Sequence, residues 1–263
     1  MRSYSSVITL NKNRRGIYSI DPIMGCMHGM KTSEKGCYGD CYAARIAKRY
    51  GYDFGKNVLR QFDSNTHLHQ IKNKIARNGF PFIRMGTMGD PSEDWDHTIK
   101  ICEKIQRQHQ LDLFNNDVKE IVIITKHWNV LTANQLNRIK KLKICINTSI
   151  SVLDNFDLLD KGIKQYEILK KYCRSILRLV SCDFNIKNQL GYSLYKLQES
   201  IFKKYKVLDT VFRVGSQNDL VITGVINVHK TKFLGMPCLV SKYNKKTYFG
   251  KCGTCIEKCG IEM

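Results

Sequence analysis

The sequence lacks any apolar run that approaches the about 18 residues needed to cross a membrane. Its first residues also lack the sustained apolar core of a secretory signal peptide. We therefore expect a cytoplasmic protein with no membrane partner, in a compartment that keeps thiols reduced. At 263 residues, the chain is long enough for one large α/β domain or two small ones.

Acidic residues are also scarce, with 23 Asp and Glu against 43 Lys and Arg, which leaves a net charge of +20. The excess recurs along the chain in Lys-rich segments at 140–143, 203–206 and 242–246. Such a charge attracts polyanions, so we expect a nucleic acid partner, with a nucleotide or an acidic peptide as alternatives. Solvated faces of a Lys-rich protein would give the same composition without a partner.

Cysteine, in contrast, is plentiful, and eleven thiols in a reducing compartment favour metal binding over disulfides. Cys26, Cys37 and Cys41 lie in a Gly-rich loop, with ten and then three residues between them, and a helix is expected directly after Cys41. Three thiolates leave one position open on a four-coordinate metal or on one iron of a cubane cluster. The alternative is a closed structural zinc site with His28 as the fourth ligand.

Apolar patterning predicts six strands, each followed by a helix or a connection of helical length. The strands are expected at 16–20, 81–85, 120–126, 143–151, 175–180 and 210–214, and helices at 42–50, 65–78, 95–108, 132–140, 154–171 and 194–204. This alternation predicts a parallel α/β sheet, either open and doubly wound or a partial barrel. In both folds the functional site lies at the carboxyl ends of the strands. Polar residues gather there at Thr125 and Lys126, at 148–151 and at 181–183.

The cysteine loop resembles that of a phage-associated branch of the radical S-adenosylmethionine (radical-SAM) superfamily. The matching residues are Gly25-Cys26, Ser33, Gly36-Cys37 and Cys41-Tyr42-Ala43, although three residues rather than two separate the last two cysteines. The resemblance implies a partial (β/α)6 barrel in which Cys26, Cys37 and Cys41 bind a [4Fe-4S] cluster. The fourth iron of that cluster would chelate S-adenosylmethionine (SAM), and an external one-electron reductant would be required.

The same resemblance suggests roles for residues at the strand ends. Gly86 and Thr87 would hold the methionyl amine of SAM, Lys126 or Arg178 its carboxylate, and Ser149 and Ser151 its ribose hydroxyls. Cys182 would face the site as a hydrogen-atom donor, although a buried structural cysteine is the commoner role for such a residue.

The last 29 residues, 235–263, form a Cys-rich tail that we separate from a barrel domain spanning residues 1–234. Cys252 and Cys255 form a Cys-x-x-Cys pair, and Cys238 and Cys259 complete a set of four thiols. Four thiolates make a closed site for zinc or for a second [4Fe-4S] cluster. The Lys- and Tyr-rich segment between Cys238 and Cys252 would bind nucleic acid or form a solvated hairpin.

These features together predict a radical-SAM enzyme that modifies or repairs a nucleic acid or a nucleotide. The alternative is a non-catalytic, zinc-stabilised nucleic-acid-binding protein. A third possibility is a partner protein that holds a cluster for another enzyme.

Overall fold

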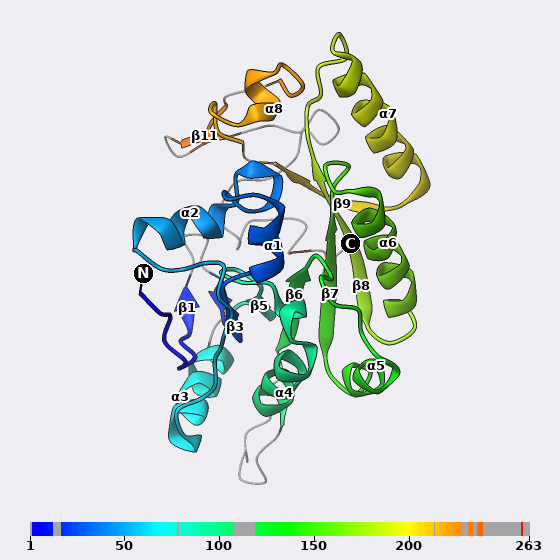
Figure 1. Ribbon diagram of the computed structural model, residues 1–263. Helices are drawn as coiled ribbons and strands as arrows, with labels where there is room; N and C mark the ends of the chain where they lie inside the picture. Colours follow the sequence, from blue (N-terminus) through cyan, green and yellow to red (C-terminus); the bar gives the residue numbers. More distant parts are fainter. Residues whose placement is uncertain are drawn as a thin grey trace.

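The computed structural model (Figure 1) describes residues 2–12, 17–77, 79–107, 119–212, 214–227, 231–233, 236–238 and 259. Within these ranges, no helix combines the length and apolarity that a membrane crossing requires.

A seven-stranded sheet forms the centre of the molecule, with strand order β1-β2-β5-β6-β7-β8-β9. Its strands are β1 (Asn11–Lys12), β2 (Tyr18–Ser19), β5 (Phe82–Met85), β6 (Glu120–Thr125), β7 (Ile144–Ile150), β8 (Arg174–Ser181) and β9 (Val207–Val211). All neighbouring pairs from β2 to β9 are parallel, and only β1 runs antiparallel to its neighbour. The order follows the sequence without reversing, whereas a doubly wound sheet reverses at its switch point. With right-handed crossovers, an order that does not reverse places the crossover helices on one face, as in a partial barrel.

The crossover helices are α3 (Asn65–Ala76), α4 (Trp95–Gln106), α5 (Ala133–Ile139), α6 (Phe156–Leu169) and α7 (Gln189–Lys204). They pack on the outer face of the sheet, where two large core clusters join their apolar side chains to alternate strand residues. Ile121 and Ile123 of β6 point to this outer face. Val122, between them, points to the inner face with Phe82 and Cys145. This alternation is the period-two pattern expected of a strand that is buried on both faces.

Smaller elements surround the cysteine loop. These are β3 (Ile23–Met24), α1 (Met27–Thr32), the 3-10 turn η1 (Cys37–Gly39), α2 (Tyr42–Arg49), β4 (Val58–Leu59), the 3-10 turn η2 (Pro91–Glu93) and α8 (Asp219–Ile222). The strands β3 and β4 pair antiparallel, and the segment that holds the three cysteines lies between them in the chain. The short strands β10 (Thr231–Phe233) and β11 (Met236–Cys238) pair with each other near the end of the chain.

The predicted α/β architecture with a mostly parallel sheet is confirmed, and the six predicted strands correspond to β2 and β5–β9. Two elements are displaced from their predicted ranges. Strand β9 spans Val207–Val211, three residues earlier at both ends than predicted, and α7 begins five residues early because the Asn188 side chain caps it. Asp94, in turn, caps α4 through the His97 backbone N–H. Ser92, two residues earlier, is fully buried and donates its hydroxyl to Asp90.

Candidate functional site: three thiols at the carboxyl ends of the sheet

The cysteine loop is bonded to segments that follow four different strands of the sheet. Gly25 donates its N–H to the Met88 carbonyl, after β5, and Tyr38 donates its hydroxyl to Asp154, after β7. Asp40 accepts the N–H of Gly215, after β9. The Lys126 ammonium, after β6, donates to the Tyr38 hydroxyl. The loop therefore covers the carboxyl ends of the strands, where parallel α/β folds place their ligand sites.

Each cysteine of the loop lies at the start of a helical turn. Cys26 caps α1 by accepting the Gly29 N–H on its sulfur at 3.3 Å, Cys37 opens η1, and Cys41 is the N-cap residue of α2. Asn218, the cap of α8, donates its side-chain amide to the carbonyl of Tyr38 in η1 at 2.8 Å. The loop is therefore held both by the helical turns within it and by Asn218, which lies far from it in the sequence.

Two glycines leave the space in which the thiols gather. A Cβ on Gly29 would lie 2.8 Å from the Cys26 sulfur and 3.3 Å from the Cys37 sulfur, so both thiols approach the same point. A Cβ on Gly36 would lie 2.5 Å from the Cys41 Cβ and 3.5 Å from its sulfur. Gly36 also has a φ of +77°, which disfavours any other residue. The structure therefore brings the sulfurs of Cys26 and Cys37 to one point, and Cys41 lies on the same loop at the start of α2.

Burial controls the ionisation of the inner two thiols. Desolvation raises the pKa of Cys37 to about 12, and the Lys126 ammonium opposes this shift. Desolvation also raises the pKa of Cys26 far above its ordinary value, reinforced by the nearby Asp90 and Cys37. A bound metal would have to displace these protons, since thiolate is the ligating form.

Among the residues that the structure describes, no three His, Cys, Asp or Glu side chains form a group that could hold a metal ion. The proposed zinc ligand His28 bonds to Glu93 through Nδ1 at 2.7 Å and stacks on Trp128.

Beside Cys37 lies a buried triad of Tyr38, Lys126 and Asp154. The Lys126 ammonium contacts both oxygens of Asp154, at 2.7 and 3.0 Å, and the Tyr38 hydroxyl donates to Asp154 at 2.9 Å. The side chains of Lys126 and Asp154 are only 11% and 3% exposed. Tyr38 has a φ of +59°, a conformation that a residue of this size adopts only when its surroundings hold it there.

Two more buried carboxylates shape the strand ends. One oxygen of Asp90 accepts from Thr125 at 2.6 Å and from the backbone and hydroxyl of Ser92, and the other accepts the Lys126 N–H at 2.8 Å. Asp21, after β2, accepts the N–H groups of the predicted SAM turn, Gly86 at 3.1 Å and Thr87 at 2.7 Å. Desolvation raises the pKa of both carboxyls, and these hydrogen bonds oppose the shift.

The predicted cofactor residues occupy one end of the sheet. Gly86 and Thr87 follow β5, and Ser149 is the register partner of Arg178 on the neighbouring strand. Ser151 is fully buried and donates to the Val180 carbonyl. The Lys126 ammonium is paired with Asp154.

Cys182 lies among core side chains. It is 4% exposed and belongs to the cluster that joins β8 to α7, where its backbone exchanges two hydrogen bonds with the Gln198 side chain. This environment is that of a structural cysteine.

The four cysteines of the Cys-rich tail lie mostly outside the part of the chain that the structure describes. Cys252 and Cys255 lie outside it, and Cys238 is placed only as the last residue of β11. The Cys259 carbonyl accepts from the Asn147 side chain at 3.0 Å, and the residue packs against Phe82 and Cys145 on the inner face of the sheet. The end of the chain therefore contacts the sheet, while a four-thiol tail site stays a prediction.

Sequence reasoning missed the carboxylates Asp21, Asp90, Glu93 and Asp154. A signal was present, because Asp21, Asp90 and Asp154 each follow a strand within about five residues, in the turn that opens onto the site. The sequence did not reveal that Glu93 and Asp154 bond to the cysteine loop, or that Asp21 bonds to the turn after β5.

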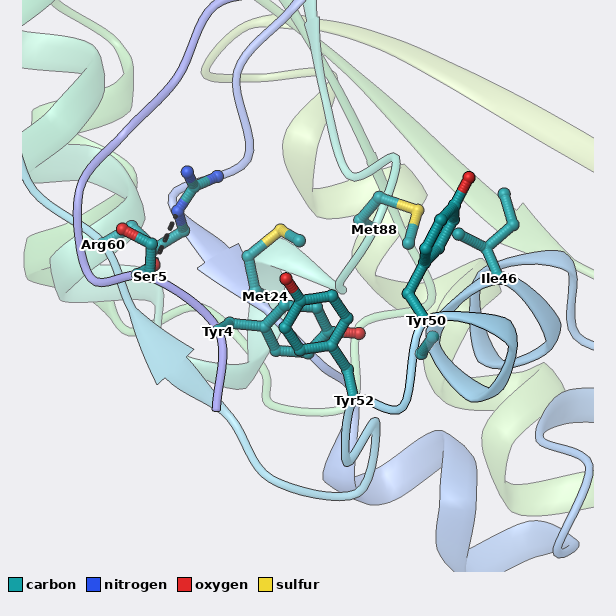
Figure 2. A pocket seen from close by; sticks show the side chains of 9 residues that line it. Tyr4, Ser5, Met24, Ile46, Tyr50, Tyr52, Arg60 and Met88 are labelled. Carbon is teal, nitrogen blue, oxygen red and sulfur yellow. Dashed lines mark hydrogen bonds between the residues drawn. The ribbon is translucent and has the colours of Figure 1, made fainter. Parts of the chain in front are cut away.

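A separate cavity of about 200 Å³ adjoins the outer side of α2 (Figure 2). The stacked rings of Tyr4 and Tyr52, 4.4 Å apart, form one wall, and Met24, Tyr50 and Met88 contribute to the rest. Arg60 borders the cavity, but its guanidinium donates to the backbone carbonyls of Ser5 and Val7 and to the Thr9 hydroxyl. Its role is therefore to hold the N-terminal segment.

No family model matches this chain, and no curated protein or solved structure matches it either.

Proposed function

We propose that this protein is a radical-SAM enzyme with a partial (β/α)6 barrel. The observation that carries the proposal is a loop that holds Cys26, Cys37 and Cys41 and is bonded across the carboxyl ends of four strands, with the sulfurs of Cys26 and Cys37 close to one point. Three thiolates on such a loop suit a cluster with one open iron.

The groups around the loop have separable roles. Cys26, Cys37 and Cys41 would hold a [4Fe-4S] cluster, and the carbonyls of the Gly86–Thr87 turn, fixed by Asp21, would orient the ammonium group of SAM. Arg178 would bind the SAM carboxylate, with Ser149 beside it. One electron from an external reductant, delivered through the bound cluster, would cleave SAM to methionine and a 5′-deoxyadenosyl radical. The loop itself would exclude water from this end of the sheet.

The net charge of +20 supports a nucleic acid or a nucleotide as the substrate class. The reaction would then begin with hydrogen abstraction from that substrate and end in a modified or repaired base. A zinc-stabilised nucleic-acid-binding protein is the second candidate, which the same charge and the tail cysteines support.

The first prediction concerns Cys37, which lies between the other two thiols. Cys37→Ala should lower the iron content by about four per chain after anaerobic reconstitution, because a cubane loses its site with one of three thiolates. Cys173→Ala is the control, because Cys173 packs at the edge of the outer core. The measurement is iron and sulfide content, with electron paramagnetic resonance of the reduced protein before and after SAM is added. Equal iron in the two variants, or zinc alone in the native chain, would refute the enzyme and favour the second candidate.

A further inference from the structure

The end of the sheet opposite the cysteine loop carries a row of exposed cations. Three cations come from each of three consecutive helix-to-strand connections, which are α5 to β7, α6 to β8 and α7 to β9. We call these nine residues the basic edge: Lys140, Lys141, Lys143, Lys170, Lys171, Arg174, Lys203, Lys204 and Lys206. Because β7, β8 and β9 are parallel neighbours in the sheet, their starting ends lie side by side and the three groups form one continuous surface.

Most of this charge is not neutralised by the protein. Lys170 pairs with Glu167 at 2.9 Å and Arg174 lies 3.5 Å from Glu120. The other seven cations make no ion pair with any residue in the described ranges.

Stabilisation of the helix ends does not explain the number of cations. The carboxyl end of a helix carries about half a negative charge, so α5, α6 and α7 together present about one and a half. One cation beside each helix end would be enough to offset this partial negative charge, whereas the basic edge has three cations beside each helix end. The excess therefore fits an external anion.

We propose that the basic edge binds the phosphate backbone of a nucleic acid. Eight of its nine cations are lysines, which suit sequence-independent phosphate contacts. The apolar residues between them, Leu142, Tyr172 and Tyr205, are half-buried and pack on the core. The edge thus presents charge rather than groups that insert into a lipid bilayer, which favours nucleic acid over an anionic membrane.

This surface is distinct from the site of the proposed reaction. Strand β8 has eight residues, so about 26 Å separates its two ends. A nucleic acid on the basic edge therefore lies far from the three thiols. The inference does not depend on the proposed enzyme activity, since it uses neither cysteine nor cofactor.

The test is fluorescence anisotropy of the full chain with a labelled DNA duplex of about 20 base pairs, from about 50 to about 200 mM salt. Lys141→Gln/Lys171→Gln/Lys204→Gln removes one cation from each connection. It should lower the slope of log affinity against log salt by about 2 to 3 and weaken binding at least about tenfold at the lowest salt. Lys100→Gln/Lys187→Gln/Lys196→Gln, on exposed residues of α4, the β8–α7 connection and α7, removes the same charge elsewhere and should change affinity less than about twofold.

Equal losses in the two triple variants would overturn the proposal, because net charge alone would then explain binding. It would also be overturned by absence of DNA binding, or by an edge that matters only for vesicles rich in phosphatidylserine. Cys37→Ala should bind DNA as the native chain does, and the edge variant should retain about four iron per chain. A failure of this inference can therefore be distinguished from a failure of the proposed enzyme.

Discussion

At the residue scale, the site depends on charges that the fold buries in pairs. Lys126 and Asp154 are both almost fully covered, and Tyr38 bonds to both. Breaking such a pair by removing one partner leaves the other charge buried without compensation.

Asp154→Ala should therefore lower the free energy of unfolding by about 3 kcal/mol, measured by urea denaturation at neutral pH. Asp160→Ala is the matched control, because Asp160 pairs with Lys164 on the surface of α6, where the side chains are 42% and 71% exposed. That change should cost less than about 1 kcal/mol. Similar losses in the two variants would contradict the assignment of a buried pair.

His127 offers a test by pH. It is fully buried after β6, bonds to Thr148 at 3.0 Å, and desolvation lowers its pKa to about 3. Because the unfolded chain binds a proton near pH 6.5 and the folded chain does not, stability falls as pH falls below that value. Protonation of His127 in the unfolded chain should therefore lower the free energy of unfolding by about 2 kcal/mol as the pH falls from about 7.5 to about 5.

The comparison for this prediction is His127→Asn, since His127 has a φ of +55° and Asn tolerates that conformation. Urea unfolding at the two pH values should show a smaller pH-dependent loss in the variant by about that amount. An unchanged difference between the pH values would show that His127 titrates normally.

At the element scale, the cysteine loop is ordered by short helical turns that the apolar pattern did not predict. Helix α1 has only six residues and begins with a thiol cap, so it carries no amphipathic repeat. Its course is set by bonds to other segments, such as the His28 N–H to Glu93 at 2.9 Å. The long helices differ, because each buries an apolar stripe against the sheet and this stripe is visible in the sequence.

Gly29 in α1 is the sharpest test of the loop. Gly29→Ala would place a methyl group within 3.3 Å of the sulfurs of Cys26 and Cys37. We expect iron after reconstitution to fall from about four per chain to below about two, although alanine is the better helix former. Gly79→Ala, where an added Cβ meets nothing within 4 Å, should keep full iron content. Full iron content in Gly29→Ala would show that the thiols do not converge there.

At the scale of the whole molecule, the parallel sheet separates two surfaces. The carboxyl ends of the strands carry the thiols and buried carboxylates, and the starting ends of β7, β8 and β9 carry the basic edge. This separation follows from connectivity, because every helix returns the chain to the same end before the next strand. A cation that follows a helix and a polar residue that follows a strand therefore lie at opposite ends of the parallel sheet.

The sequence by itself determined most of the elements and singled out three cysteines on one loop. Strands such as β6 and helices such as α4 were predictable because each buries a periodic apolar face, and Cys26, Cys37 and Cys41 stood out because they lie together in a Gly-rich stretch. Only the tertiary structure decided that the strand order does not reverse, that Lys126 pairs with Asp154 rather than remaining free for a ligand, and that Cys182 is buried. The physical reason is that strand order and ion pairing depend on contacts between residues far apart in the chain, whereas periodicity reports only on neighbours.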